Sequence, residues 1–157
     1  MKKIAVFLFE GAELFEIATF TDIFGWNNIV GLKEFRDIKV ETISYKESIK
    51  CTWGGKIKVE KVITEENIGK FFDYDILIIP GGFGKANFFE GKNNEIFKKL
   101  IKYFSESNKI IVAICSAVIN LLESGYIKNK KVTTYLLDNK RYFNQLKNYN
   151  IIPVEEE

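Results

Sequence analysis

The first candidate for chemistry in this sequence is Cys115, which stands where the hydrophobic pattern changes. Residues 110–114 form a short, β-branched apolar run, a pattern typical of a strand buried on both faces. After the cysteine, Leu121 and Leu122 follow Val118 at helical spacing, and Gly125 suits a left-handed helix end. We therefore expect a sharp strand-to-helix turn at Cys115.

Small residues flank this cysteine, because Ala113 and Ala117 each lie two positions away. The pattern is a looser form of the glycine-flanked nucleophile elbow, in which small neighbours allow a close turn. The sulfur would then lie beside the free N–H groups of the helix, which lower a thiol pKa from ~8.5 to about 3.5–7.5. The alternative is a buried cysteine that acts as a small hydrophobic residue. The position at the junction favours the nucleophile.

A carboxylate is the best candidate for a proton carrier, because the chain contains no histidine. That absence excludes a Cys-His catalytic pair and zinc held by histidine. Glu16 lies between Phe15 and Ile17 in the first turn of an expected helix, where partial desolvation would let it hold a proton. The alternative is an acid that only complements the helix dipole, which is the role we expect for Glu13.

Backbone N–H groups are the third component of the expected site. A glycine-rich turn would expose them, because Pro80 is followed by Gly81, Gly82 and Gly84. N–H groups from the Gly82 turn and from Ser116 could form an oxyanion hole above the sulfur. Two alternatives stay open: the glycines only permit a tight turn, and Ser116 only caps its helix. A phosphate cradle is disfavoured, because the first strand-to-helix turn carries carboxylates in place of glycines.

Alternating strands and helices would position these groups. We expect strands at residues 3–9, 38–44, 75–79 and 110–114, a small strand or a hairpin within 51–60, and short strands at 131–135 and 150–154. Amphipathic helical patterns separate most of them. This order predicts an α/β fold, a mostly parallel sheet with helices on both faces. In such a sheet the carboxyl ends of the strands form the ligand site, where the acidic turn, the glycine turn and Cys115 meet.

Composition narrows the class of protein. The 157 residues fit one domain, and 23 basic against 21 acidic residues give a net charge of only +2. The lysines are spread along the chain, which disfavours nucleic-acid binding, and no segment is long enough to cross a membrane. Cys51 and Cys115 lie far apart, so we expect no disulfide, a reducing cytoplasmic location, and a packing or surface role for Cys51.

Four motifs together resemble the ThiJ/PfpI superfamily, a group with the class I glutamine amidotransferase-like architecture. They are the acidic turn at residues 9–16, the glycine turn at 78–82, the elbow at 113–117, and Lys-Val-Thr-Thr at 131–134. The resemblance implies a flavodoxin-like fold, Cys115 as nucleophile, Glu16 as its carboxylate partner, and Gly82 and Ser116 as oxyanion donors. It also implies no cofactor, no metal and a homodimer or larger assembly. Gly81 and Tyr135 would add to the substrate site.

Members of that superfamily include glyoxalases and deglycases, isonitrile hydratases, peptidases and redox-responsive or chaperone-like proteins. This chain has Tyr135 where many members have histidine, and Ser116 where the peptidase branch has histidine, which argues against peptidase and amidotransferase activity. A hydroxyl residue after the cysteine is more like the isonitrile hydratases. The family's closing helix is missing after Val154, so we expect an uncovered apolar strip that causes self-association or marginal stability.

The leading hypothesis is therefore a cysteine-dependent enzyme of stress metabolism that acts on small electrophiles, either glyoxalase- or deglycase-like or hydratase-like. Cys115 would attack the substrate and Glu16 would move a proton. The alternative is a redox-sensing, chaperone-like or regulatory protein in which Cys115 is oxidised without turnover.

Overall fold

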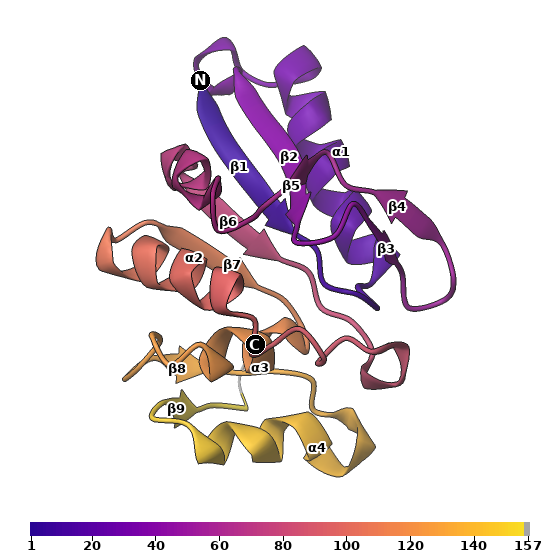
Figure 1. Cartoon of the computed structure of the whole chain (residues 1–157), viewed down its shortest axis with the longest axis vertical. Helices are drawn as coiled ribbons and strands as arrows, with labels where there is room; N and C mark the ends of the chain where they lie inside the picture. The colour runs from indigo at the N-terminus through magenta and orange to yellow at the C-terminus, as the bar shows by residue number, and fades with distance from the viewer. Residues whose placement is uncertain (156–157) are drawn as a thin grey trace.

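The computed structural model describes residues 1–155, which are built on a five-stranded sheet in the order β5-β2-β1-β6-β7 (Figure 1). Every neighbouring pair in this sheet is parallel. Its strands are β1 (Lys2–Phe7), β2 (Ile38–Ser44), β5 (Lys61–Val62), β6 (Ile76–Ile79) and β7 (Ile110–Ala113). The prediction of a flavodoxin-like α/β sheet is confirmed.

The central strand β1 is buried because its sequence is apolar on both faces. Residues 4–9 are each no more than 1% exposed, as expected for a strand covered on both sides. Phe7 and Phe9 pack against Phe97 with ring centroids 5.0 and 4.8 Å apart. This aromatic core holds the carboxyl end of β1, and therefore the acidic turn that follows it, in a fixed place.

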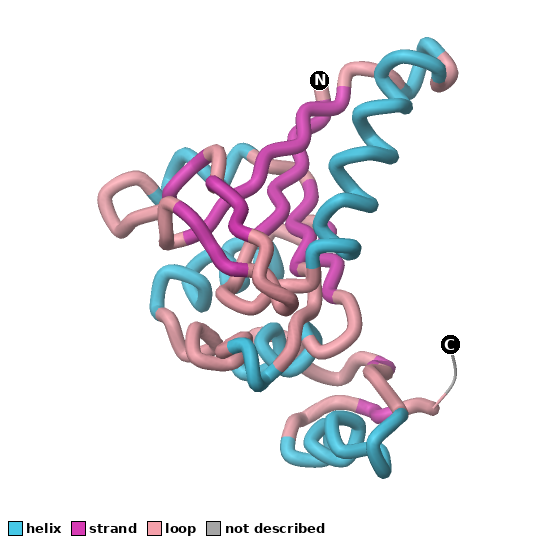
Figure 2. The backbone as a smooth tube through the Cα atoms, turned by 90° about the vertical axis from the view of Figure 1, so that its right-hand side faces the viewer, coloured by secondary structure: helices cyan, strands magenta, loops and turns pink. Residues whose placement is uncertain are grey.

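Helices cover both faces of the sheet. The chain moves outward from β1 to β2 through α1 (Leu14–Val30), and in the opposite direction from β6 to β7 through α2 (Glu95–Glu106). Because parallel crossovers are right-handed, the two helices lie on opposite faces. Figure 2 shows α1 running along one side of the sheet. Asn94 begins α2, since its side-chain oxygen accepts the N–H groups of Ile96 and Phe97.

Two smaller sheets frame the carboxyl edge. Strands β3 (Ser48–Lys50) and β4 (Lys56–Lys58) form an antiparallel hairpin, whose first strand lies before the range 51–60 expected from the sequence. Strands β8 (Lys131–Val132) and β9 (Ile152–Pro153) pair in parallel. Helices α3 (Ala117–Glu123) and α4 (Leu137–Gln145) contribute to a second hydrophobic cluster in the C-terminal part of the chain. Short 3-10 helices complete the chain at Lys33–Phe35, Ile68–Asp73, Gly84–Ala86 and Leu146–Asn148.

The expectation that the strand before Cys115 is buried on both faces is wrong. Strand β7 is an edge strand with β6 as its one neighbour in the sheet, and Ile110 is 57% exposed while Ile111, Val112 and Ala113 are partly exposed. An apolar run shows that a strand avoids water, but it does not show how many neighbours the strand has. Within residues 1–155, no helix is long and apolar enough to span a membrane.

Candidate active site

The predicted nucleophile elbow at Cys115 is present. Between the end of β7 and the start of α3, Cys115 adopts a left-handed conformation with φ +52°, which is uncommon for a residue other than glycine. The N–H of Ile114 still bonds to Ile79 of β6 at 3.1 Å, and the N–H of Ala117 turns back to Ile114 at 2.9 Å. The hydroxyl of Thr134 donates to the Cys115 carbonyl at 2.6 Å. Sheet, helix and a distant loop therefore all fix this turn.

Glu16 reaches the elbow from the first turn of α1. Its Oε2 accepts the backbone N–H of Gly81 at 2.5 Å. A Cβ atom added to Gly81 would lie 2.9 Å from the Cβ of Cys115 and 2.9 Å from Glu16 Oε2. Both groups thus crowd one point, and only glycine leaves the space between them. Gly81 is therefore needed to bring the carboxylate and the cysteine together.

The acidic turn and the glycine turn are joined by backbone contacts. Ala12 and Gly82 form an isolated antiparallel bridge, and the N–H of Glu13 donates to Gly81 at 2.7 Å. The N–H of Phe83 donates to Gly11 at 3.2 Å. These bonds satisfy buried polar groups at the strand ends and set the depth at which Glu16 enters the site.

The protonation of the pair differs from the sequence-based expectation. Burial, and then the nearby Glu16 carboxylate, raise the pKa of Cys115 despite the backbone N–H of Ser116 directed at the sulfur. Burial also raises the pKa of Glu16, against the lowering effect of the Gly81 N–H. The predicted fall in the thiol pKa is thus wrong, because the carboxylate and desolvation outweigh the helix N-terminus. Both shifts favour the protonated, uncharged forms of the two groups.

Ser116 and Gly82 lie beside the sulfur, but with a different arrangement from the one expected. The N–H of Gly82 donates to Ser116 Oγ at 3.0 Å, and Ser116 Oγ donates to the Gly82 carbonyl at 2.6 Å. The Gly82 N–H is therefore already paired and is not free for a substrate oxygen. Nor does the Ser116 side chain cap α3. The backbone N–H of Ser116, which is directed at the sulfur, is the remaining candidate for the expected oxyanion donor.

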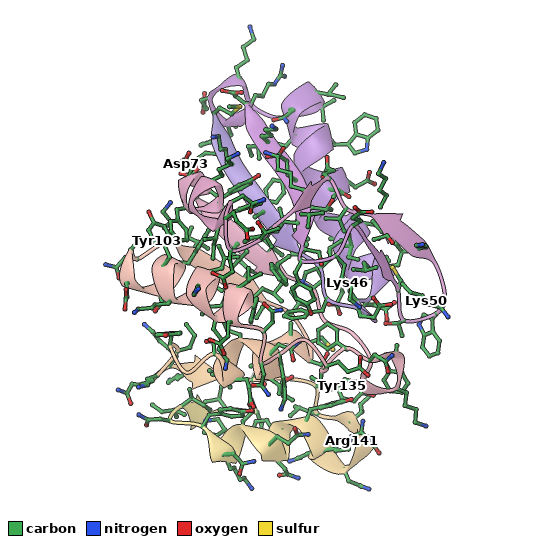
Figure 3. All side chains as sticks on the ribbon, viewed as in Figure 1. Lys46, Lys50, Asp73, Tyr103, Tyr135 and Arg141 are labelled. Carbon is green, nitrogen blue, oxygen red and sulfur yellow. The ribbon has the colours of Figure 1, made fainter. Side chains whose placement is uncertain are left out.

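A cavity of about 450 Å³ opens above these groups, and Glu13, Glu16, Gly82, Cys115, Ser116 and Tyr135 are among its lining residues. Six further lining residues were not predicted: Thr52, Trp53, Phe83, Asp138, Arg141 and Tyr142. Figure 3 labels Tyr135 and Arg141, which come from the loop before α4 and from α4 itself. Trp53 carried a usable signal, because it stands before two glycines in a predicted hairpin turn and belongs to no periodic core pattern.

The remaining cysteine lies outside this cavity. Cys51 begins the hairpin turn, is 3% exposed and unpaired, and so has the expected packing role. Within residues 1–155, His, Cys, Asp and Glu side chains form no group of three that could hold a metal ion.

A doubly wound parallel sheet with a cysteine at a strand-to-helix elbow, and an acidic turn beside it, defines a class of flavodoxin-like proteins. Residues 2–155 match the model of the DJ-1/PfpI family, and the chain belongs to that family. This confirms the resemblance to the ThiJ/PfpI superfamily noted from the four motifs.

Individual relatives agree with this assignment. An uncharacterised protein of Methanocaldococcus jannaschii is 32% identical over an alignment of 123 residues, and the match covers 68% of this chain and 57% of that protein. YraA of Bacillus subtilis, a proposed cysteine protease, is 30% identical over 96 residues, which are 61% of this chain and 53% of that protein. The chain thus spans little more than half the length of these curated relatives.

The fold also matches solved structures. Drosophila melanogaster DJ-1beta superposes with a TM-score of 0.78 at 23% identity, covering 99% of this chain and 75% of that one. At this identity the likeness concerns the fold.

Proposed function

We propose that this protein is a cysteine-dependent enzyme that acts on small electrophilic substrates, with Cys115 as nucleophile and Glu16 as proton carrier. The observation that carries the proposal is the convergence at Gly81, where one point lies 2.9 Å from both Cys115 Cβ and Glu16 Oε2. The pair borders a cavity large enough for a small molecule. The two free cysteines suit a reducing compartment, and we place the protein in the cytoplasm.

The proposed chemistry uses a proton that Glu16 carries. In the reactive form the sulfur is a thiolate and Glu16 is protonated. For a 2-oxoaldehyde, the thiolate forms a bond to the aldehyde carbon, and the carbonyl electron pair moves to oxygen, which takes the proton of Glu16 and bonds to the Ser116 N–H. The Glu16 carboxylate then moves the C–H proton to the neighbouring carbon, and the hydroxyl proton passes to the former ketone oxygen. The carbon bonded to sulfur thereby becomes the carbonyl of a thioester. Water hydrolyses it, so the net change is addition of one water and needs no cofactor.

Turnover of methylglyoxal and of a simple alkyl isonitrile tests this function. We expect the wild type to consume one of them, and Cys115→Ser and Glu16→Gln each to lose at least about a hundredfold in kcat/KM. Cys51→Ser and Glu34→Gln are matched controls, since neither residue lines the cavity, and both should retain wild-type rates. Activity that survives in Cys115→Ser or Glu16→Gln would exclude the mechanism.

A second candidate function uses the same thiolate as a redox sensor. It is favoured by the Ser116 N–H beside the sulfur and by the raised pKa of Glu16, because both a backbone N–H and a protonated carboxyl group can donate a hydrogen bond to a sulfinate. Mass spectrometry after mild peroxide should then show oxidation at Cys115, while the buried Cys51 stays reduced. Selective oxidation without turnover of either substrate would favour the sensor over the enzyme.

A further inference from the structure

Two pairs of aromatic side chains line the cavity above Cys115, and the chemistry described above does not use them. Trp53 and Phe83 come from the β3–β4 turn and from the loop after β6, and their ring centroids lie 6.1 Å apart at 31°. Tyr135 and Tyr142 come from the loop before α4 and from α4, with centroids 6.0 Å apart at 65°. Both separations are typical of interacting aromatic rings.

Trp53 does not serve the hydrophobic core, because it is 82% exposed. Its turn is nevertheless fixed to the acidic turn: the N–H of Thr52 donates to Ala12 at 3.0 Å, and the Thr52 hydroxyl donates to Gly11 at 2.8 Å. A rigid turn therefore presents a large, water-exposed indole at the cavity. A flat ligand that stacks on this exposed indole would remove apolar surface from water and so contribute free energy of binding.

In the tyrosine pair, Tyr142 is fixed by burial and by contacts with Arg141. Tyr142 is 6% exposed, its hydroxyl accepts a hydrogen bond from Arg141 at 2.8 Å, and the Arg141 guanidinium lies 4.7 Å from its ring centroid. Tyr135 packs against this fixed ring and is 39% exposed at the cavity. The cavity thus has aromatic surface on two separate segments of the chain, close to the reactive sulfur.

We propose that this cavity selects electrophiles that carry an aromatic ring beside the reactive carbon, over those that carry a methyl group there. The proposal rests on the proposed function in taking Cys115 as the group that reacts. A flat ring can stack on or meet the edges of Trp53 and Tyr135, whereas a methyl group cannot make these contacts. Aryl-substituted 2-oxoaldehydes or aryl isonitriles are the substrate class that this surface suits.

Alkylation of Cys115 tests the preference without requiring turnover. The probes are iodoacetamide and its N-phenyl derivative, each of which forms a sulfur–carbon bond and releases iodide. Rates at Cys115 are measured by peptide mass spectrometry and divided by the rate of the same reagent with glutathione. We expect the wild type to favour the phenyl reagent about tenfold. Trp53→Ala and Tyr135→Ala should each lose about threefold of that preference, and the double variant should lose all of it.

Matched controls are available on the surface. Trp26 on α1 is 60% exposed and Tyr126 is 39% exposed, and neither lines the cavity. Trp26→Ala and Tyr126→Ala should keep the wild-type preference. Equal normalised rates in the wild type, or a preference that persists in the double variant, would overturn the proposal. An aryl preference without turnover of any substrate would refute only the proposed function, and turnover of methylglyoxal without aryl preference would refute only the aromatic site.

Discussion

The hydroxyl of Ser116 binds both backbone polar groups of Gly82, accepting its N–H at 3.0 Å and donating to its carbonyl at 2.6 Å. Ser116 directly follows Cys115, and Gly82 belongs to the turn that leaves β6. The serine is 1% exposed, so no water competes for these bonds. The pair therefore sets the distance between the cysteine elbow and the turn that binds Glu16 through Gly81.

Ser116→Ala should loosen this link. Loss of the hydroxyl leaves the buried N–H and carbonyl of Gly82 without this partner, and we expect the free energy of unfolding to fall by about 1–3 kcal/mol. Alkylation of Cys115 should also change, because the Ser116 N–H shifts relative to the sulfur. Denaturant unfolding and labelling kinetics measure the two effects. Ser124→Ala is the control, since the Ser124 hydroxyl bonds locally to Leu121 at 2.6 Å, and it should leave the labelling rate unchanged. Equal labelling rates in Ser116→Ala and wild type would show that the link does not position the sulfur.

The pH dependence of Cys115 alkylation should move when Glu16 is neutralised. In the wild type the Glu16 carboxylate raises the pKa of the thiol, so the rate rises with pH at a higher midpoint than for an isolated cysteine. Glu16→Gln removes that negative charge, and the midpoint should fall. Labelling with iodoacetamide between pH 5 and about pH 10 measures the midpoint. Glu34→Gln, on the exposed 3-10 helix, should reproduce the wild-type curve. An unchanged or higher midpoint in Glu16→Gln would contradict the electrostatic effect of Glu16 on the thiol.

The free energy of unfolding should depend on pH because of Glu41 on β2. Burial raises its pKa, but hydrogen bonds from Tyr74, Lys39 and Lys61 outweigh this and lower the pKa to about 2 from 4.5. The carboxylate therefore stabilises the fold fully above about pH 4.5, and this contribution is lost as pH falls toward about 2. Glu41→Gln should cost about 1–3 kcal/mol at pH 7. Urea unfolding at several pH values should show the difference from wild type shrinking below pH 4.5.

The control for Glu41 is Glu95→Gln, since the Glu95 side chain is 71% exposed in its pair with Lys98. It should change stability by less than about 0.5 kcal/mol at any pH. A Glu41→Gln deficit that is the same at pH 3 and pH 7 would show that loss of packing, and not of charge, explains the effect.

Apolar surface on α1 should cause self-association at low micromolar concentration. The helix carries its own apolar side chains on all sides. Four of them are each more than half exposed: Ile23, Trp26, Ile29 and Val30. A helix that is apolar all round is normally buried, and a second copy of the chain would cover it. Sedimentation should show dimers or larger species in the wild type and monomers in Trp26→Lys with Ile29→Lys. Ile110→Lys tests whether the exposed Ile110 side chain at the start of β7 also takes part. A wild type that is monomeric at such concentrations would contradict both surfaces.

The fold could be predicted from the sequence because its signals are local. β-Branched runs at β1, β6 and β7, each followed by glycine or cysteine at a strand end, place the turns at one edge of a parallel sheet. The elbow was predictable for the same reason, since Cys115 stands between two patterns. How much of β7 is covered is not a local property, because it depends on which strand or helix lies beside it.

The geometry of the site required the structure. The sequence brings Gly82 and Ser116 to one place, but it does not show that they bond to each other and so withdraw the Gly82 N–H from catalysis. The direction of the Cys115 pKa depends on a balance between the helix N-terminus and Glu16, and a spacing in sequence gives no weight to either. Arg141 and Tyr142 look like ordinary residues of an amphipathic helix, so their place at the cavity could not be foreseen.

The hydroxyl of Thr134 that holds the Cys115 carbonyl belongs to a region with its own hydrophobic cluster, formed by Val118, Leu122, Phe143 and Leu146. Local opening of that cluster would detach residues 131–145 while the five-stranded sheet keeps its hydrogen bonds. We therefore expect the site to lie across two units that open separately. The less stable unit sets how long the assembled site persists, and amide hydrogen exchange in α4 is expected to report that lifetime.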